Sequence, residues 1–211
     1  MNKLDFVNSC AENKPDFVVQ KHLIEGSSFF FDTYYNDQEF QFKKDIATSL
    51  GVHIRDVVIV GSGKLGFSIK PFLNDDNILE YNFNDFDFNF NKDNNNLKSD
   101  LDIAIVSGKL FDEQLIELYL YTKGYSNYGY NNSLKKAEFA NYILKGWLRP
   151  DKVPNDYSIN SEVVKVQEKY KALFGRKVNI GLYKSWYFFE SYHQKNINRI
   201  KLINITKNIS K

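Results

Sequence analysis

The chain has 211 residues, 43% of them hydrophobic and 26% charged, and carries a formal net charge of +2 at pH 7. Such a length and composition describe an ordinary soluble globular protein that can bury a core as one domain. A net charge this small neither indicates nor excludes nucleic acid as a partner. The only cysteine, Cys10, excludes an internal disulfide and a cysteine zinc cluster, and it fits a reducing cytoplasm.

No apolar run approaches the roughly 20 residues that a helix needs to cross a bilayer, and we expect no contact with membranes. Residues 1–5 lack the apolar core of a signal peptide. We therefore expect one cytoplasmic domain over residues 1–211. In this domain an Asn-rich insertion occupies about residues 74–98, and the part from about residue 133 onward is mostly helical.

The first third of the chain is expected to be mainly helical. Scattered apolar residues predict a short helix over residues 15–25, and a second helix is expected to follow Asp37 and to end at Gly51. Residues 29–35 are dense in phenylalanine and tyrosine. We expect these rings to pack in the core or in a lid, with a stacking platform for a nucleobase as the alternative.

A short β-branched run, Val57–Val60, stops at a glycine, which is typical of a buried strand that leads into a tight turn. Any helix that begins at Ser62 should end before Pro71, because proline cannot continue it. Alternating aromatic residues over 81–90 predict a hairpin arm, and residues 93–96 have the composition of a mobile loop.

The rest of the chain alternates between apolar strands and amphipathic helices. Short strands are expected at residues 99–106 and 177–183. Helices are expected over residues 111–122, 134–148, 161–174 and 185–205. This order predicts the α/β (α+β) class. Its small mixed β-sheet, flanked by helices, would carry the strands at 57–60, 99–106 and 177–183.

The turn after the first strand has the chemistry of a phosphate site. A strand that ends in Gly61-Ser62 leaves backbone N–H groups unpaired at the turn. If a helix follows, its N-terminus adds a partial positive charge, so the turn suits a phosphate. Lys64 can add a point charge to the same phosphate. Gly61, Ser62 and Lys64 are therefore candidate nucleotide-binding residues.

The later strand carries two acids at alternate positions. Side chains at i and i+2 of a strand point to the same face, so Asp100 and Asp102 are expected to project together. Two carboxylates on one face repel each other unless a cation lies between them, and Mg²⁺ is the usual cation where phosphates are handled. Asp85 and Asp87 have the same spacing, but they lie in the Asn-rich insertion rather than on a credible central strand.

Together these motifs resemble the nucleotidyltransferase superfamily typified by DNA polymerase β. Its signature is a hydrophobic strand, Gly-Ser, a short helix, and Asp-x-Asp on the next strand. The matching positions within about residues 56–111 are Gly61, Ser62 and Gly66, followed by Ser99, Asp100 and Asp102. The resemblance implies that the Gly-Ser turn holds a triphosphate, with Ser99 as a further nucleotide-binding candidate. It also implies that the two aspartates are catalytic and hold Mg²⁺ or Mn²⁺.

The function implied by the resemblance is metal-dependent transfer of a nucleoside monophosphate from a nucleoside triphosphate to an unidentified acceptor. Two cations about 4 Å apart can lower the pKa of an attacking hydroxyl and neutralise the leaving pyrophosphate. In small bacterial members of the superfamily the acceptor is a protein, a nucleotide or an RNA end. Such members often belong to toxin–antitoxin or phage-defence systems, a class-level analogy.

Many superfamily members place a third carboxylate on a later neighbouring strand. At the centre of the strand predicted over 177–183 stands Asn179, whose amide carries no charge to balance a second metal. Asp112, Glu113 or Asp151 are the other candidates for this place. The alternative function is therefore a catalytically degenerate nucleotide-binding or protein-interaction module of the same fold.

A second alternative is a protein that binds NAD. Gly61-x-Gly63-x-x-Gly66 after a strand fits the dinucleotide-binding fingerprint. The fingerprint also requires a long helix and a second parallel strand that ends in an acid about 20 residues later. Here Pro71 limits the helix, and the Asn-rich insertion occupies the place of the second strand.

Overall fold

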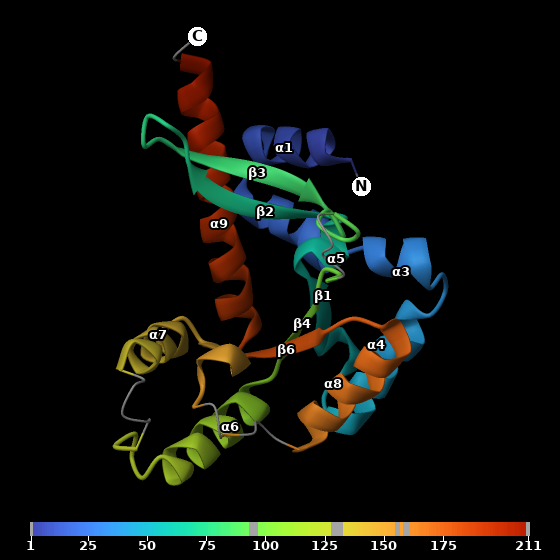
Figure 1. The fold of residues 1–211 in the computed structure, drawn as a ribbon, viewed down its shortest axis with the longest axis vertical. Helices are drawn as coiled ribbons and strands as arrows, with labels where there is room; N and C mark the ends of the chain where they lie inside the picture. The colour runs from blue at the N-terminus through green and yellow to red at the C-terminus, as the bar shows by residue number, and fades with distance from the viewer. Residues whose placement is uncertain (1, 93–96, 128–132, 155–156, 158–160, 210–211) are drawn as a thin grey trace. The chain divides into compact units, whose positions relative to one another are not determined.

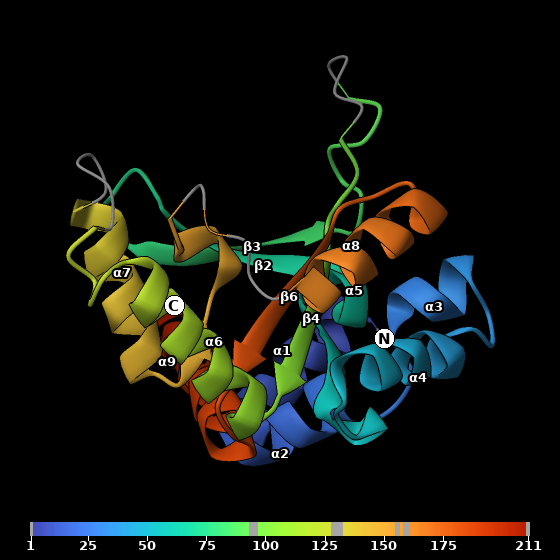
Figure 2. The same ribbon diagram turned by 90° about the horizontal axis from the view of Figure 1, so that it is seen from below.

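The computed structural model of the chain (Figures 1 and 2) describes residues 2–92, 97–127, 133–154, 157 and 161–209. Within these ranges, the side chains of residue 133 and of residues 202–209 are not described. The loop predicted over residues 93–96 lies outside the described residues.

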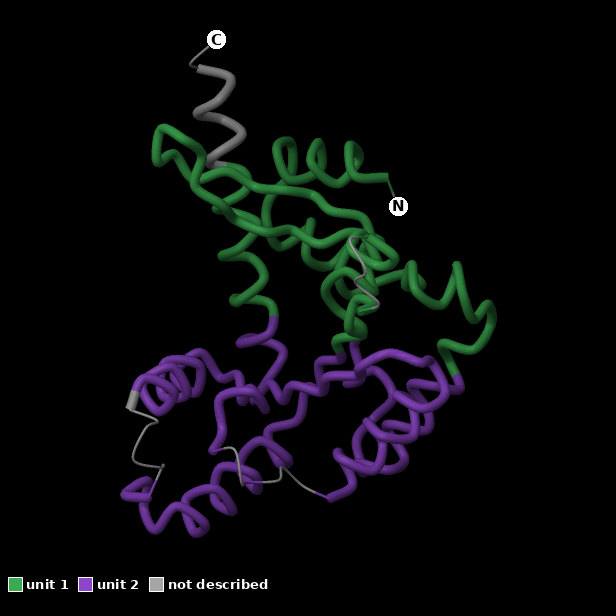
Figure 3. Tube along the Cα trace, in the orientation of Figure 1, with its two compact units in different colours: residues 1–40, 59–102, 190–211 green, residues 41–58, 103–189 purple. Residues whose placement is uncertain are grey.

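The chain divides into two compact units, and each is assembled from segments that are distant in sequence (Figure 3). Unit 1 comprises residues 1–40, 59–102 and 190–211, and unit 2 comprises residues 41–58 and 103–189. The helical part predicted from about residue 133 is shared between them.

The N-terminal part of unit 1 is helical. It consists of α1 (Lys3–Glu12), α2 (Pro15–Val19), a π-helical turn (Gln20–Ile24) and α3 (Phe29–Tyr34). Proline is well tolerated at the start of α2, since the first N–H groups of a helix have no intrahelical partner. The helix predicted over residues 15–25 therefore forms as α2 and the π-helical turn.

The predicted strand β1 (Val57–Val60) is confirmed, and α5 (Gly61–Leu65) follows it directly. The helix ends before Pro71, as predicted, and Gly66 ends it by adopting the left-handed conformation with φ 85°. A Cβ at Gly66 would lie 2.7 Å from the ring of Phe29, so the close packing of α3 also requires glycine here.

A β-hairpin follows α5, made of β2 (Phe67–Leu73) and β3 (Leu79–Asp85) in a two-stranded antiparallel sheet. The predicted arm therefore begins before residue 81. Pro71 lies inside β2 rather than after a helix. A two-stranded sheet has only edge strands, and an edge strand tolerates the missing N–H of proline.

Unit 1 has its own hydrophobic core, which joins helices from both ends of the chain to the hairpin. Its buried members are Phe6, Cys10, Val18, Val19, Leu23, Leu65, Phe67, Ile197 and Ile200. The last two come from α9 (Trp186–Ile209), the helix predicted over residues 185–205. This core therefore fixes α5, β2 and the part of α9 that belongs to unit 1 in one body.

The main sheet has four strands in the order β1-β4-β6-β5. The added strands are β4 (Leu101–Val106), β6 (Val178–Tyr183) and β5 (Trp147–Leu148), and β5 runs antiparallel to β6. A mixed sheet flanked by helices confirms the predicted α+β class. The helix predicted over 134–148 ends at Leu144, since Gly146 adopts φ 63° and leads the chain into β5.

The other helices of the chain lie close to their predicted positions. They are α4 (Glu39–Leu50), α6 (Gly108–Tyr121), α7 (Ser133–Leu144) and α8 (Ser161–Phe174). Single 3-10 turns occupy Ile54–Asp56 and Pro150–Lys152. Among the helices in the described part of the chain, none combines the length and the apolar character needed to cross a membrane.

The pairing of α4 with α8 illustrates how unit 2 is held together. The rings of Phe42 and Tyr170 lie 4.5 Å apart between centroids. Lys169 and the Tyr170 hydroxyl donate to the carboxylate of Asp45 at 2.7 and 2.8 Å. These hydrogen bonds lower the pKa of Asp45 below its ordinary value.

Burial makes the Cys10 thiol unreactive in the folded protein. The side chain is fully buried in the core of unit 1, and burial raises the pKa of the thiol to about 12. Because the thiolate is the nucleophile, we expect no reaction of the native protein with a thiol-specific disulfide reagent at mildly alkaline pH. In concentrated guanidinium the thiol should react fully. Rapid labelling of the native protein, followed by absorbance, would contradict this packing.

Candidate functional site

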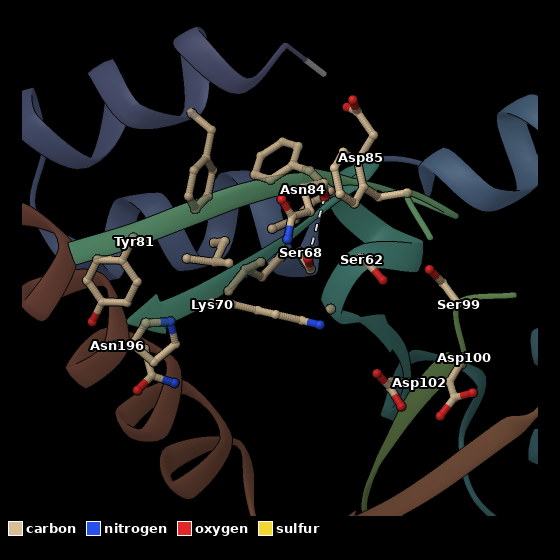
Figure 4. A pocket seen from close by; sticks show the side chains of 18 of the residues that line it. Ser62, Ser68, Lys70, Tyr81, Asn84, Asp85, Ser99, Asp100, Asp102 and Asn196 are labelled. Carbon is tan, nitrogen blue, oxygen red and sulfur yellow. Dashed lines mark hydrogen bonds between the residues drawn. The ribbon is translucent and has the colours of Figure 1, made fainter. Parts of the chain in front are cut away.

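Unit 1 contains a pocket of about 740 Å³, and all of the residues that line it belong to this unit (Figure 4). The pocket lies within the range of small-molecule sites, roughly 300 to 1,000 Å³. Its walls come from α5, the β2–β3 hairpin, the start of β4 and α9. Most sequence-predicted site residues line it, namely Gly61, Ser62, Ser99, Asp100 and Asp102.

The glycine-serine turn and the second aspartate lie against each other. A Cβ placed on Gly61 would lie 3.2 Å from Oδ2 of Asp102. Gly61 also adopts φ 65°, a conformation that residues with a side chain rarely take. The glycine therefore serves both the turn and the close approach of the carboxylate.

The two aspartates alternate with a core residue as the strand periodicity predicts. Asp100 and Asp102 line the pocket and are partly buried, whereas Leu101 between them is fully buried. A Cβ on Gly63 would lie 2.7 Å from Cδ1 of Leu101, so the missing side chain leaves room for the leucine. Figure 4 shows Ser62, Asp100 and Asp102 on the same side of the pocket.

Ser99 is held by a reciprocal pair of hydrogen bonds. Its N–H donates to Oδ1 of Asp87 at 2.7 Å, and the N–H of Asp87 donates to Oγ of Ser99 at 2.9 Å. This contact fixes the chain before β4 to the segment that follows β3. Asp87 therefore has a structural role in this contact.

The two acids of the alternative pair in the insertion do not converge with each other, although Asp85 also lines the pocket. Asp85 forms an ion pair with Lys3 at 2.7 Å, and Figure 4 shows its carboxylate directed away from Asp100 and Asp102. With Asp87 bound to Ser99, the two acids of this pair serve different contacts. The geometry therefore favours Asp100 and Asp102, at the start of β4, as the candidate metal site.

Lys64 is not placed to bind a phosphate in this pocket. Its side chain is buried, and its ammonium group donates to the carbonyl oxygens of Glu25 and Gly26 at 2.8 and 2.6 Å. It is not among the residues that line the pocket. The structure therefore gives no support to the predicted nucleotide contact of Lys64. Its two hydrogen bonds instead tie α5 to the turn before α3.

A different lysine, Lys70 of β2, faces the pocket. Figure 4 shows its side chain extended toward the side that holds Ser62 and the two aspartates. Lys98 and Arg199 also line the pocket, and all three basic residues are exposed. Lys70 was not among the predicted site residues, because no strand was predicted over residues 67–73.

Neutral polar groups line the opposite end of the pocket. They include Tyr81 from β3 and Asn196 from α9 (Figure 4). His193 also lines the pocket, and burial lowers the pKa of its imidazole to about 4. The imidazole is therefore neutral at physiological pH.

The third-position candidates belong to unit 2. Asn179 lies on β6. Asp112 pairs with Lys184, Asp151 with Arg149 and Glu113 with Lys109. In the part of the chain that the structure describes, no group of three or more His, Cys, Asp or Glu side chains could hold a metal ion.

The features required for a dinucleotide-binding fold do not follow the glycine turn. Within the described residues, α5 has five residues, and the chain then enters an antiparallel hairpin. The fingerprint needs a longer helix and a parallel strand at this point. The spacing Gly61-x-Gly63-x-x-Gly66 is instead used for a tight turn, for the packing of Leu101 and for the end of α5.

The structure predicts that Lys64 stabilises the fold. Lys64→Met removes a charged donor from two backbone carbonyls, and we expect a loss of about 2 kcal/mol in the free energy of unfolding. Chemical denaturation followed by circular dichroism measures this loss. Lys44→Met, at an exposed position on α4, is the matched control and should change stability little. Equal stability of the two variants would contradict the structural role of Lys64.

The pocket thus offers a carboxylate pair beside a glycine-serine turn at one end, a lysine along one wall, and neutral hydrogen-bonding groups at the other end. Such a set of groups can bind a divalent cation together with an anionic ligand that has a neutral polar part. Comparison with protein families, with curated proteins and with solved structures finds none that matches this chain.

Proposed function

We propose that the protein is a metal-dependent nucleotidyltransferase, which binds a nucleoside triphosphate in the pocket of unit 1 and transfers its nucleoside monophosphate to an acceptor. The observation that carries this proposal is the placement of Asp102 against Gly61, with Asp100 and Ser62 on the same side of one pocket. These are the residues whose order along the chain resembles the nucleotidyltransferase motif.

The donor set fits Mg²⁺ or Mn²⁺. Mg²⁺ is usually held by one or two carboxylates together with substrate phosphates and water, rather than by a cage of protein ligands. Asp100 and Asp102 supply two carboxylates, and the phosphates of the nucleotide supply further oxygens. When bound there, the cation would neutralise charge on the phosphate oxygens and acidify an attacking hydroxyl.

The residues of the chain would divide the work of binding the triphosphate. The Ser62 hydroxyl can donate a hydrogen bond to a phosphate oxygen, and the absence of a side chain on Gly61 lets the phosphate approach the backbone. The dipole of α5 adds little, because the helix has only five residues. Lys70 contributes a full positive charge from the adjacent wall of the pocket.

An assay of transfer tests the proposal directly. We expect label from an α-phosphate-labelled nucleoside triphosphate to enter an acceptor in a cell extract when Mg²⁺ or Mn²⁺ is present. The double variant Asp100→Asn/Asp102→Asn should lose turnover by about a hundredfold or more, because it removes the charge that holds the cation. Its thermal unfolding should stay close to that of the wild type.

The matched control is Asp75→Asn/Asp76→Asn in the exposed β2–β3 turn, outside the pocket, which should retain full transfer. Metal-dependent nucleotide binding without transfer in any fraction would favour the catalytically degenerate module. If the triphosphate does not bind at all, the proposed function is excluded.

Lys70 is expected to contribute to affinity for phosphate. Lys70→Gln removes a positive charge that faces the carboxylate end of the pocket, and we expect about a tenfold weaker binding of inorganic triphosphate with Mg²⁺. Isothermal titration calorimetry measures this change. Lys195→Gln, at an exposed position on α9 that does not line the pocket, should leave the affinity unchanged. Equal affinities of the two variants would show that Lys70 does not contact the phosphates.

A further inference from the structure

The pocket of unit 1 has two ends with different chemistry. Ser62, Asp100 and Asp102 lie at one end, and Tyr81 and Asn196 lie at the other, with the side chain of the pocket lysine of β2 extended between them (Figure 4). The function proposed above uses the first end and that lysine. It leaves the second end, between β3 and α9, without a role.

The side chains at the second end are held in place and can accept a ligand. Tyr81 packs against the core of unit 1, and Asn196 directly precedes Ile197, which belongs to the same core. Both side chains are partly buried. Their hydroxyl and amide groups make no hydrogen bond with the residues that the structure describes. Packing therefore positions both side chains, and both line the pocket.

We infer that this end of the pocket binds the nucleobase of the nucleotide, with Tyr81 and Asn196 as the residues that recognise it. This inference rests on the proposed function, because it assumes that the phosphates lie at the end with Asp100 and Asp102. It goes further by naming the residues that select the nucleoside.

The chemistry of the second end suits a base rather than another phosphate. A nucleobase is planar and uncharged, with apolar faces and a polar edge. The Asn196 amide offers a donor and an acceptor side by side, the pattern that reads the edge of a base. The ring of Tyr81 offers a face for stacking. The neutral imidazole of His193 adds no charge here.

The order of charges along the pocket also matches a nucleotide. Carboxylates that can hold a cation come first, the ammonium group of Lys70 follows, and the uncharged side chains of Tyr81 and Asn196 lie at the far end. A nucleoside triphosphate has the same order, from metal-bound phosphates to an uncharged base. Arg199, one turn beyond Asn196 on α9, can stack on a base through its planar guanidinium group.

Calorimetric titration with two kinds of probe tests this inference. The probes are the four common nucleoside triphosphates and inorganic triphosphate, each with Mg²⁺. For Asn196→Leu we expect a loss of roughly tenfold to a hundredfold in affinity for the preferred nucleoside triphosphate. Its affinity for inorganic triphosphate should be unchanged. Asn196→Asp preserves the size of the side chain and should show the same pattern if the leucine variant unfolds.

The matched control is Asn198→Leu, since Asn198 is exposed on the same helix and does not line the pocket. This variant should bind both kinds of probe as the wild type does. If both Asn196 variants keep full affinity for every nucleoside triphosphate, the base subsite is excluded while the phosphate site stands. If neither kind of probe binds the wild type, the proposed function itself fails.

Discussion

The contact between the Asp102 carboxylate and the backbone of Gly61 is the constraint on which the candidate site depends. The carboxylate lies 3.2 Å from the point where a Cβ would stand, and the same glycine has φ 65°. A side chain here would strain the turn and displace the carboxylate. Gly63 has a parallel role, because its missing Cβ makes room for Leu101. The two glycines therefore allow α5 to lie directly on the start of β4.

The surroundings of this contact join the walls of the pocket to one another. The hydrophobic core of unit 1 includes Leu65 at the end of α5, Phe67 at the start of β2, and Ile197 and Ile200 of α9. These residues come from three walls of the pocket. Lys64 adds a polar anchor between α5 and the turn at residues 25–26. Buried groups that are packed and hydrogen-bonded hold the functional side chains in place.

Sequence reasoning succeeded where one local pattern dominated, and it failed where a distant contact decided the outcome. The β-branched run at 57–60 and the amphipathic run at 161–174 formed a strand and a helix with the predicted bounds. The helix after Ser62 ends before Pro71 as predicted, but Gly66 ends it rather than the proline, and the ring of Phe29 fills the adjacent space. A strand through Pro71 was missed, since proline is unfavourable in sheets except at edges.

The sequence by itself determined that Asp100 and Asp102 share a face and that a glycine-serine turn follows the first strand. Both follow from local backbone periodicity and from the conformational freedom of glycine. Only the tertiary structure decided which lysine faces the pocket. Lys64 is closer to the turn in sequence, yet packing directs it to two carbonyls, while Lys70 reaches the pocket from a separate strand. A long side chain is directed by what surrounds it, and those surroundings come from remote segments.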